Sequence, residues 1–321
     1  MLCCSACLVA ANASAPAPPG KLIDLGGYRL HVNCTGRGRP VVVVEVGLGD
    51  FSFDWSLVQS NVSRFTRICT YDRAGYAWSD SGPMPRTFAQ LNLELKDALG
   101  KLGERGPYVL VGHSFGGPVV RNFATTYPRE VAGMVLVDSA FEGQRVGVGG
   151  EKTIRLGENS QGRAIPAPRE EMTDADRPPA PKEGNREGTL DPMYNPLPPA
   201  EQRMQVWAQS LTKTDYAEAS QRQWSEEYFA MWLKTPQKGT LGDIPLVVLM
   251  RAQGGYGDDL DVPAAQLEKE RREGQANLAL LSTKGKLVTV RSGHNMELDA
   301  PDEVTAAIRS VVEAARTRSW P

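Results

Sequence analysis

Apolar residues along the chain form short runs that alternate with helical patterns. The third run, Val41–Val46, is apolar at almost every position, which is typical of a strand buried on both faces. Gly26-Gly27 separates the first two runs and predicts a hairpin there. The predicted strands are Lys21–Leu25, Tyr28–Asn33, Val41–Val46, Arg67–Tyr71, Tyr108–Val111, Met134–Val137, Pro245–Met250 and Lys286–Val290.

Helical spacing of apolar residues appears between these runs. It is clear in Leu91–Leu102, Val119–Tyr127, Val262–Leu281 and Pro301–Ala315, the last with Pro at its first turn. Strands that alternate with helices favour a parallel sheet with helices on both faces. We therefore expect an α/β fold with a mostly parallel eight-stranded sheet.

The alternation stops near Ala140. Glycine, proline and charged residues dominate Glu142–Pro199 without a strand pattern, and Glu201–Lys234 indicates one or two amphipathic helices. We interpret residues 140–239 as a helical cap inserted into a core formed by residues 21–139 and 240–321.

Composition removes several function classes. The 321 residues include 36 basic and 38 acidic side chains, so the net charge of −2 gives no field that would attract nucleic acid. No apolar run is long enough to cross a bilayer. Cys4 and Cys7 lack a second ligand pair at zinc spacing, and no phosphate or dinucleotide loop is found, so we expect no metal and no cofactor.

Residues 1–20 are interpreted as a leader. Met1–Ala15 is small and apolar, and Ala11-Asn12-Ala13 fits a cleavage site, which favours export to the periplasm. The segment has no Lys or Arg and is short, so a cytosolic leader is the alternative.

A nucleophile is indicated by Gly112-His113-Ser114-Phe115-Gly116, which lies between a predicted strand and a predicted helix. The glycines permit a tight turn that exposes the Ser114 hydroxyl. The N–H of Phe115 would then lie at a helix N-terminus, where it can stabilise an oxyanion.

Ser114 needs a general base. His31 lies within the second strand, far from the carboxyl edge of the sheet, and the side chain of His113 should point away from its neighbour Ser114. His294 follows the last strand on a loop and is therefore the expected base.

With these motifs the chain resembles the α/β-hydrolase family. The other marks are Val46-Gly47-Leu48-Gly49, Tyr71-Asp72-Arg73-Ala74-Gly75 and Ser292-Gly293-His294. The resemblance implies the chain order serine, acid, histidine and a cap. It also implies a second oxyanion N–H from Leu48, although Val46 stands where the family has histidine. Glu45 is an unexpected charge that either pairs with Arg73 or lines the pocket.

The acid has two candidates. The family usually places it after the strand that follows the cap, where this chain has Met250-Arg251 and no carboxylate before Asp258. Asp138, after the strand that follows the nucleophile helix, is the other position the family uses. We prefer Asp138, because the acid must be held rigidly against the histidine, and keep Asp258 as the alternative.

The resemblance also makes the strands of Cys34 and Cys69 antiparallel neighbours, which would allow a disulfide between them. We expect a serine esterase that acts on an apolar carboxylic ester or lactone. The alternatives are a peptidase of the proline-iminopeptidase type and a non-catalytic ligand receptor on the same fold. The sequence leaves the oligomeric state open.

Overall fold

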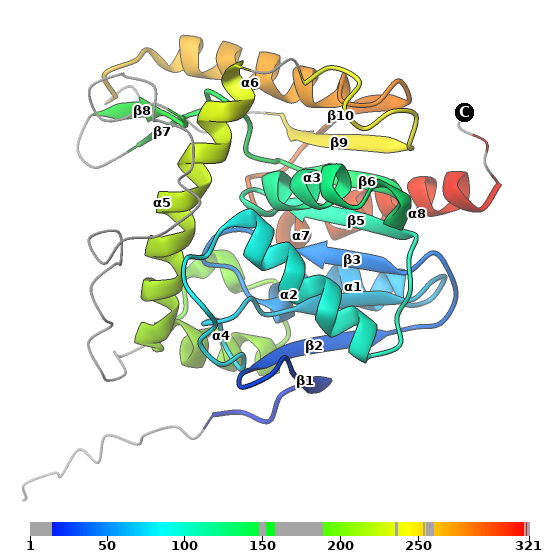
Figure 1. Ribbon diagram of the computed structural model, residues 1–321. Helices are drawn as coiled ribbons and strands as arrows, with labels where there is room; N and C mark the ends of the chain where they lie inside the picture. Colours follow the sequence, from blue (N-terminus) through cyan, green and yellow to red (C-terminus); the bar gives the residue numbers. More distant parts are fainter. Residues whose placement is uncertain are drawn as a thin grey trace, which may run out of the picture.

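The structure is a computed structural model that describes residues 15–147, 152–157, 189–234, 237–252, 254, 260–317 and 319. Its centre is an eight-stranded sheet in the order β1-β2-β4-β3-β5-β6-β9-β10 (Figure 1). Pairings of β2 with β1 and with β4 are antiparallel, and all others are parallel. The predicted mostly parallel sheet is confirmed. The strands are β1 Lys21–Asp24, β2 Arg29–Thr35, β3 Val42–Glu45, β4 Ile68–Tyr71, β5 Tyr108–His113, β6 Val131–Val137, β9 Leu246–Arg251 and β10 Gly285–Val290.

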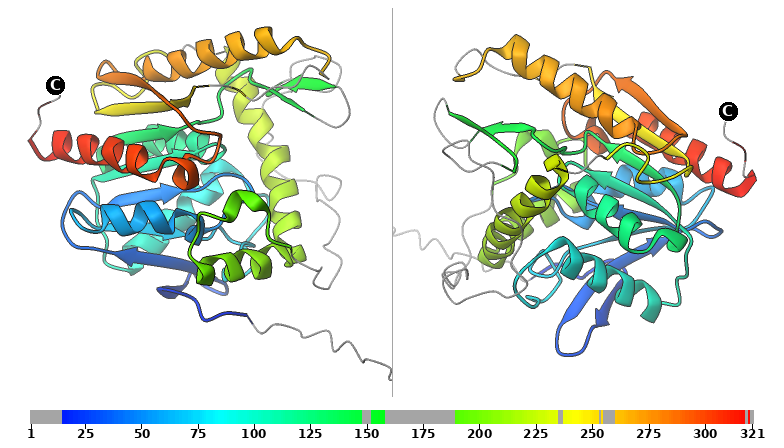
Figure 2. Two further views of the ribbon diagram at one scale, coloured as in Figure 1. Left: turned by 180° about the vertical axis from the view of Figure 1, so that it is seen from behind. Right: turned by 45° about the horizontal axis from the view of Figure 1, so that its top comes forward.

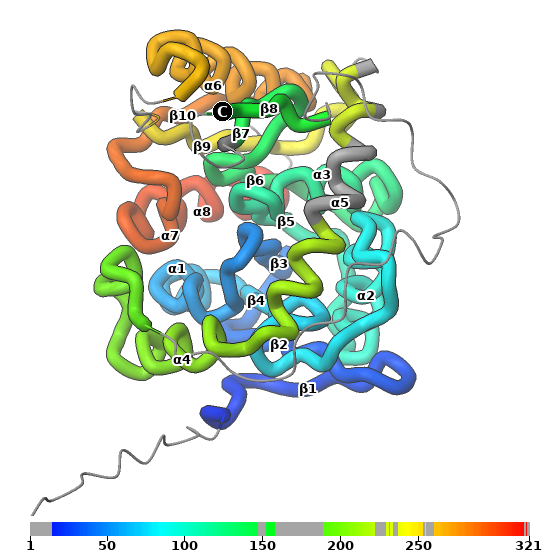
Figure 3. The backbone as a smooth tube through the Cα atoms, turned by 90° about the vertical axis from the view of Figure 1, so that its left-hand side faces the viewer, coloured from blue at the N-terminus to red at the C-terminus, as the bar shows by residue number. Residues whose placement is uncertain are grey.

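Helices cover both faces of the sheet (Figures 2 and 3). On one face lie α2 (Phe88–Lys101), α3 (Gly116–Thr126) and α6 (Ala264–Ala279), and on the other α1 (Ser56–Val62) and α8 (Pro301–Thr317). Strand β3 is buried on both faces. Val43 packs on the side of α2, α3 and α6, and Val42 and Val44 pack on the side of α1 and α8. Both faces are apolar, so the strand is apolar throughout.

Described helices between β6 and β9 lie over the carboxyl edge of the sheet. They are α4 (Pro199–Gln209) and α5 (Thr212–Lys234), where one or two helices were expected, and the short 3₁₀ helix η4 (Pro192–Tyr194). In Figure 3, α5 crosses in front of the central strands. Tyr76 Oη donates to Gln221 Oε1 over 3.1 Å, and Ser220 Oγ accepts from the Arg86 N–H over 3.0 Å, which ties α5 to the core.

The sequence analysis missed several short elements. Strands β7 (Arg145–Gly147) and β8 (Thr153–Arg155) form a separate antiparallel pair where no strand was expected. Three residues are too few for an alternating pattern to be recognised. Helix α1 and the four-residue helix α7 (Met296–Asp299) were also not predicted. Within the described residues, no helix has both the length and the apolar character needed to span a bilayer.

Candidate active site

Ser114 lies in a strained turn between β5 and α3. Its φ of 49° is in the left-handed region, which costs free energy for a residue with a side chain. The backbone is held on both sides, because the Ser114 N–H donates to the Val137 carbonyl over 3.1 Å and its own carbonyl accepts from Ala140 N–H over 2.9 Å. This fixed turn is the geometry of a nucleophile elbow.

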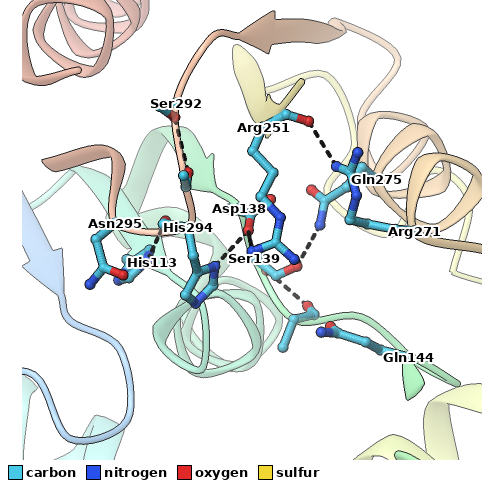
Figure 4. A network of polar contacts seen from close by, with 12 residues as sticks. His113, Asp138, Ser139, Gln144, Arg251, Arg271, Gln275, Ser292, His294 and Asn295 are labelled. Atoms are coloured by element: carbon cyan, nitrogen blue, oxygen red, sulfur yellow. Dashed lines mark hydrogen bonds and ion pairs between the residues drawn. The ribbon is translucent and has the colours of Figure 1, made fainter. Parts of the chain in front are cut away.

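His294 and Asp138 are brought together at the same edge of the sheet (Figure 4). His294 Nδ1 lies 2.6 Å from Asp138 Oδ2. Asp138 follows β6, and its φ of 38° is again left-handed. Because Nδ1 faces the carboxylate, Nε2 is the nitrogen that remains for a substrate or a hydroxyl group. Asp258, the alternative acid, lies outside the described residues.

The Asp138 carboxylate is buried, with 4% of its side chain exposed. Burial raises its pKa, but the hydrogen bond with His294 and the nearby Arg251 guanidinium outweigh this, and the net pKa is lowered. Asp138 is therefore ionised at neutral pH and can orient and stabilise an imidazolium.

Arg73 stabilises the loop after β3 by hydrogen bonds. The Arg73 guanidinium donates to the carbonyls of Val46 and Gly47. A trans peptide points its C=O and N–H in opposite directions, so the Leu48 N–H faces away from Arg73. Among the described residues, the Leu48 and Phe115 N–H groups donate to no backbone carbonyl, and both can serve a ligand oxygen.

Glu45 pairs with Arg73 beneath this loop, which is the first of the two expected alternatives. Glu45 Oε1 lies 2.7 Å from Arg73 Nη1, both side chains are fully buried, and Tyr71 Oη also donates to the carboxylate. A buried pair of this kind keeps its geometry only with such additional hydrogen bonds.

His113 joins the loop after β3 to the loop of His294. Asp50 Oδ2 lies 2.9 Å from His113 Nδ1 and accepts the Gly47 N–H over 3.0 Å. His113 Nε2 lies 3.1 Å from the His294 carbonyl oxygen. Burial lowers the His113 pKa, but the charges of Glu297 and Asp50 and the hydrogen bonds to Asp50 and His294 raise it to about 10. An imidazolium donates from both nitrogens, so His113 holds the His294 backbone and is not available as a base.

Glu297 completes this buried cluster. Its Oε2 lies 3.8 Å from His113 Nε2, and burial raises the Glu297 pKa to about 7. Asp50, His113 and Glu297 are close enough to hold a cation, but a doubly protonated imidazole has no lone pair to offer. The donor set therefore fits an internal ion pair better than a metal.

His31 lies closer to the functional edge than the sequence analysis predicted. Because β2 is antiparallel to β4, its first residues lie level with the residues that follow β4. His31 Nδ1 is 2.7 Å from Asp72 Oδ2, and its Nε2 contacts the Pro19 carbonyl. Both nitrogens have internal partners and the ring is fully buried, which makes the residue structural.

Apolar side chains surround Leu48 and Phe115. Leu48 and Phe115 pack with Phe88, Leu91 and Val119 of the core and with Trp232 of α5. The ring of Phe88 lies 5.6 Å from that of Phe115 and 6.0 Å from that of Trp232. This aromatic group provides an apolar wall beside the polar centre.

A mostly parallel sheet, a strained serine turn after β5 and helices over the carboxyl edge are together typical of the α/β-hydrolase fold. The family description "Alpha/beta hydrolase family" matches residues 41–307 of the 321, and the chain belongs to this family.

Individual similarities are more limited. A protein of Hormonema carpetanum named "Probable transporter efuK" is 36% identical over 129 residues, which cover 38% of this chain and 18% of that protein. The chain spans less than half of the length of the first curated relatives it matches. The structure of an esterase from Thermogutta terrifontis is 19% identical, with a TM-score of 0.60 over 92% of this chain and 97% of that chain. The enol-lactonase of Burkholderia xenovorans LB400 is 18% identical, with a TM-score of 0.60 over 89% of this chain and 97% of that chain. At these identities the two structures show the shared fold alone.

Sequence reasoning missed Asp50, Glu297 and Arg251 as partners of the site. Asp50 follows the Gly47-Leu48-Gly49 loop directly, and Arg251 occupies the strand end where an acid was sought. The signal was present in both cases, but the contacts depend on how loops after different strands meet.

Proposed function

We propose that the protein is a serine hydrolase that cleaves an apolar carboxylic ester or lactone through an acyl-enzyme. The observation that carries this proposal is the pairing of His294 with Asp138 at the edge where the strained Ser114 turn lies. An esterase and an enol-lactonase are among the solved proteins that share this fold, which agrees with this choice.

The proposed reaction assigns one role to each of these residues. Ser114 Oγ attacks the carbonyl carbon while His294 Nε2 takes its proton, and Asp138 stabilises the imidazolium. The N–H groups of Leu48 and Phe115 bind the oxyanion. His294 then returns the proton to the leaving alkoxide, and water cleaves the acyl-enzyme by the same steps. The aromatic wall with Phe88 and Trp232 favours an apolar acyl or alcohol group.

The first prediction tests the nucleophile. Purified protein should hydrolyse para-nitrophenyl esters, and Ser114→Ala should lower kcat/KM by about a thousand-fold or more, because only the oxyanion donors remain. Release of para-nitrophenol measures this, and circular dichroism confirms that the variant is folded. Unchanged turnover in Ser114→Ala would exclude the mechanism.

The peptidase alternative depends on a cap carboxylate that could anchor an amine. Glu218 of α5 is the relevant group, since a β-carbon at Gly49 would lie 3.2 Å from its Oε1. An aminoacyl-arylamide belongs in the same assay for this reason. Faster cleavage of the arylamide than of the esters, lost in Glu218→Gln, would replace the esterase proposal with a peptidase.

A further inference from the structure

Arg251 contacts the carboxylate that holds the general base. It is the last residue of β9, and β9 pairs with β6, which ends just before Asp138. The Asp138 N–H donates to the Leu249 carbonyl over 2.8 Å, so the two strand ends are directly linked. A cation therefore stands at the strand end where the family resemblance suggested an acid.

Two side chains, His294 and Arg251, contact the same carboxylate oxygen of Asp138. His294 Nδ1 lies 2.6 Å and Arg251 Nη1 lies 3.2 Å from the same Oδ2 (Figure 4). Only 16% of the Arg251 side chain and 4% of the Asp138 side chain are exposed. The Arg251 backbone is also held, because its carbonyl accepts from Arg271 Nη1 over 2.9 Å.

Two more cationic groups lie near His294, Asp138 and Arg251, and each has a carboxylate partner. On the β5 side the His113 imidazolium is matched by Asp50, with Glu297 behind it. On the α6 side Arg271 is matched by Glu268 over 2.7 Å. Among the described residues, the charged and titratable groups linked to His294, Asp138 or Arg251, directly or through one partner, are thus Arg251, His113, Asp50, Glu297, Arg271 and Glu268.

We propose that Arg251 sets the pH range of catalysis by sharing the Asp138 carboxylate with His294, so that the base loses its proton at lower pH. A carboxylate stabilises an imidazolium, and a cation on the same oxygen opposes this effect. The inference rests on the proposed hydrolase function and extends it by a positioning residue that acts through Asp138.

The expected shift follows from the sign of the charge. Without Arg251, the imidazolium of His294 is favoured, and the acid limb of the kcat/KM profile moves to higher pH. The Arg251 charge lies within a few ångströms of Asp138, and water partly screens its effect at the half-exposed imidazole of His294. Loss of this charge should therefore move the midpoint of the acid limb by about 0.5 to 1 pH unit.

The experiment compares two neutral variants, Arg251→Gln and Arg251→Met, with Arg251→Lys. Both neutral variants should raise the midpoint of the acid limb, and Arg251→Lys, which keeps the charge, should stay near the wild-type midpoint. Arg29→Gln is the matched control, because it removes the same charge from an exposed ion pair with Asp80. Folding is checked by circular dichroism.

A second readout does not need turnover. The chain has three histidines, so ¹⁵N-histidine labelling gives few imidazole signals, and the titration of His294 can be followed in a Ser114→Ala background. His294→Gln assigns the signal. An equal upward shift in this titration with either neutral variant supports the inference even if no tested ester is cleaved, which separates it from failure of the proposed function.

An unmoved titration of His294 in both neutral variants would overturn the proposal. A rate loss that is equal at every pH, with an unchanged midpoint of the acid limb, would likewise contradict the proposal. Such a result would indicate that Arg251 has a structural role only. A midpoint that moves as far in Arg29→Gln would assign the effect to net charge and would also overturn it.

Discussion

Asp138 has the most specific role of any single side chain around His294. Its burial, its left-handed backbone and its contact with Nδ1 place a fixed carboxylate on one ring nitrogen and leave Nε2 for the proposed proton transfer. Sequence reasoning could rank it above Asp258 only through the requirement for rigidity. The choice between the two as catalytic acid is therefore a matter for mutation.

Asp138→Asn should lower the acylation rate by about a thousand-fold or more, because the amide can hold the wrong tautomer of His294. Asp258→Asn is the comparison variant and should leave the rate near that of the wild type. Stopped-flow release of para-nitrophenol measures both. The reverse ranking would move the acid to the later loop, and two small effects would exclude both residues.

His113 should make stability depend on pH. Its pKa is raised from 6.5 to about 10 in the folded protein, so its contribution is complete below pH 6.5 and is lost as the pH rises toward 10. The free energy of unfolding should fall by about 1–3 kcal/mol over this range, because the buried Asp50 loses its counter-charge.

His113→Gln provides the test of that linkage. Urea unfolding at several pH values should show a lower stability for the variant at pH 6.5 and a smaller difference from the wild type near pH 10. A difference that stays constant with pH would contradict the protonated state of His113.

At the scale of elements, the contact between β3 and α3 sets the position of the serine turn. A β-carbon at Gly116 would lie 2.1 Å from the Glu45 carbonyl oxygen and 2.7 Å from that of Val46. Both are backbone atoms at the end of β3 and the start of the loop that follows it. Helix α3 can therefore approach the sheet this closely only with glycine at its first turn.

Gly116→Ala should destabilise the protein by about 2 kcal/mol or more and lower the rate, since the helix must move away from β3. Gly100→Ala in α2 is the matched control, because nothing lies within 4 Å of its added carbon. It should be neutral or stabilising by up to about 1 kcal/mol. Thermal unfolding with an ester assay measures both, and equal effects would refute the packing argument.

At the scale of the whole molecule, a disulfide joins two strands near the edge of the sheet. Cys34 of β2 lies directly opposite Cys69 of β4, and their sulfurs are bonded across a sequence separation of 35. The expected pairing is confirmed. Disulfides persist in oxidising compartments, which supports our proposal that the protein is exported.

Replacing both cysteines by serine should lower the free energy of unfolding by about 2–4 kcal/mol, because the unfolded chain regains the freedom of the closed loop. Urea titration measures this. Intact-mass analysis of the unreduced protein, alkylated after unfolding, should show no label on Cys34 or Cys69. Two labelled thiols would contradict the bond and weaken the proposal of export.

Sequence patterns alone predict the sheet, its alternation with helices and the places of Ser114 and His294 at strand ends. These features come from local chemistry: apolar periodicity follows the faces that an element buries, and a glycine-flanked serine between strand and helix has one stable turn. A change of composition near Ala140 likewise predicts an insertion.

The folded structure determines which distant side chains meet. It places His294 and Arg251 on one carboxylate oxygen of Asp138, Asp50 and Glu297 around His113, and Glu45 beneath the loop after β3. The antiparallel direction of β2 put His31 level with Asp72. Such contacts join residues far apart in the chain, and their energies depend on burial and strand order, which no local pattern records.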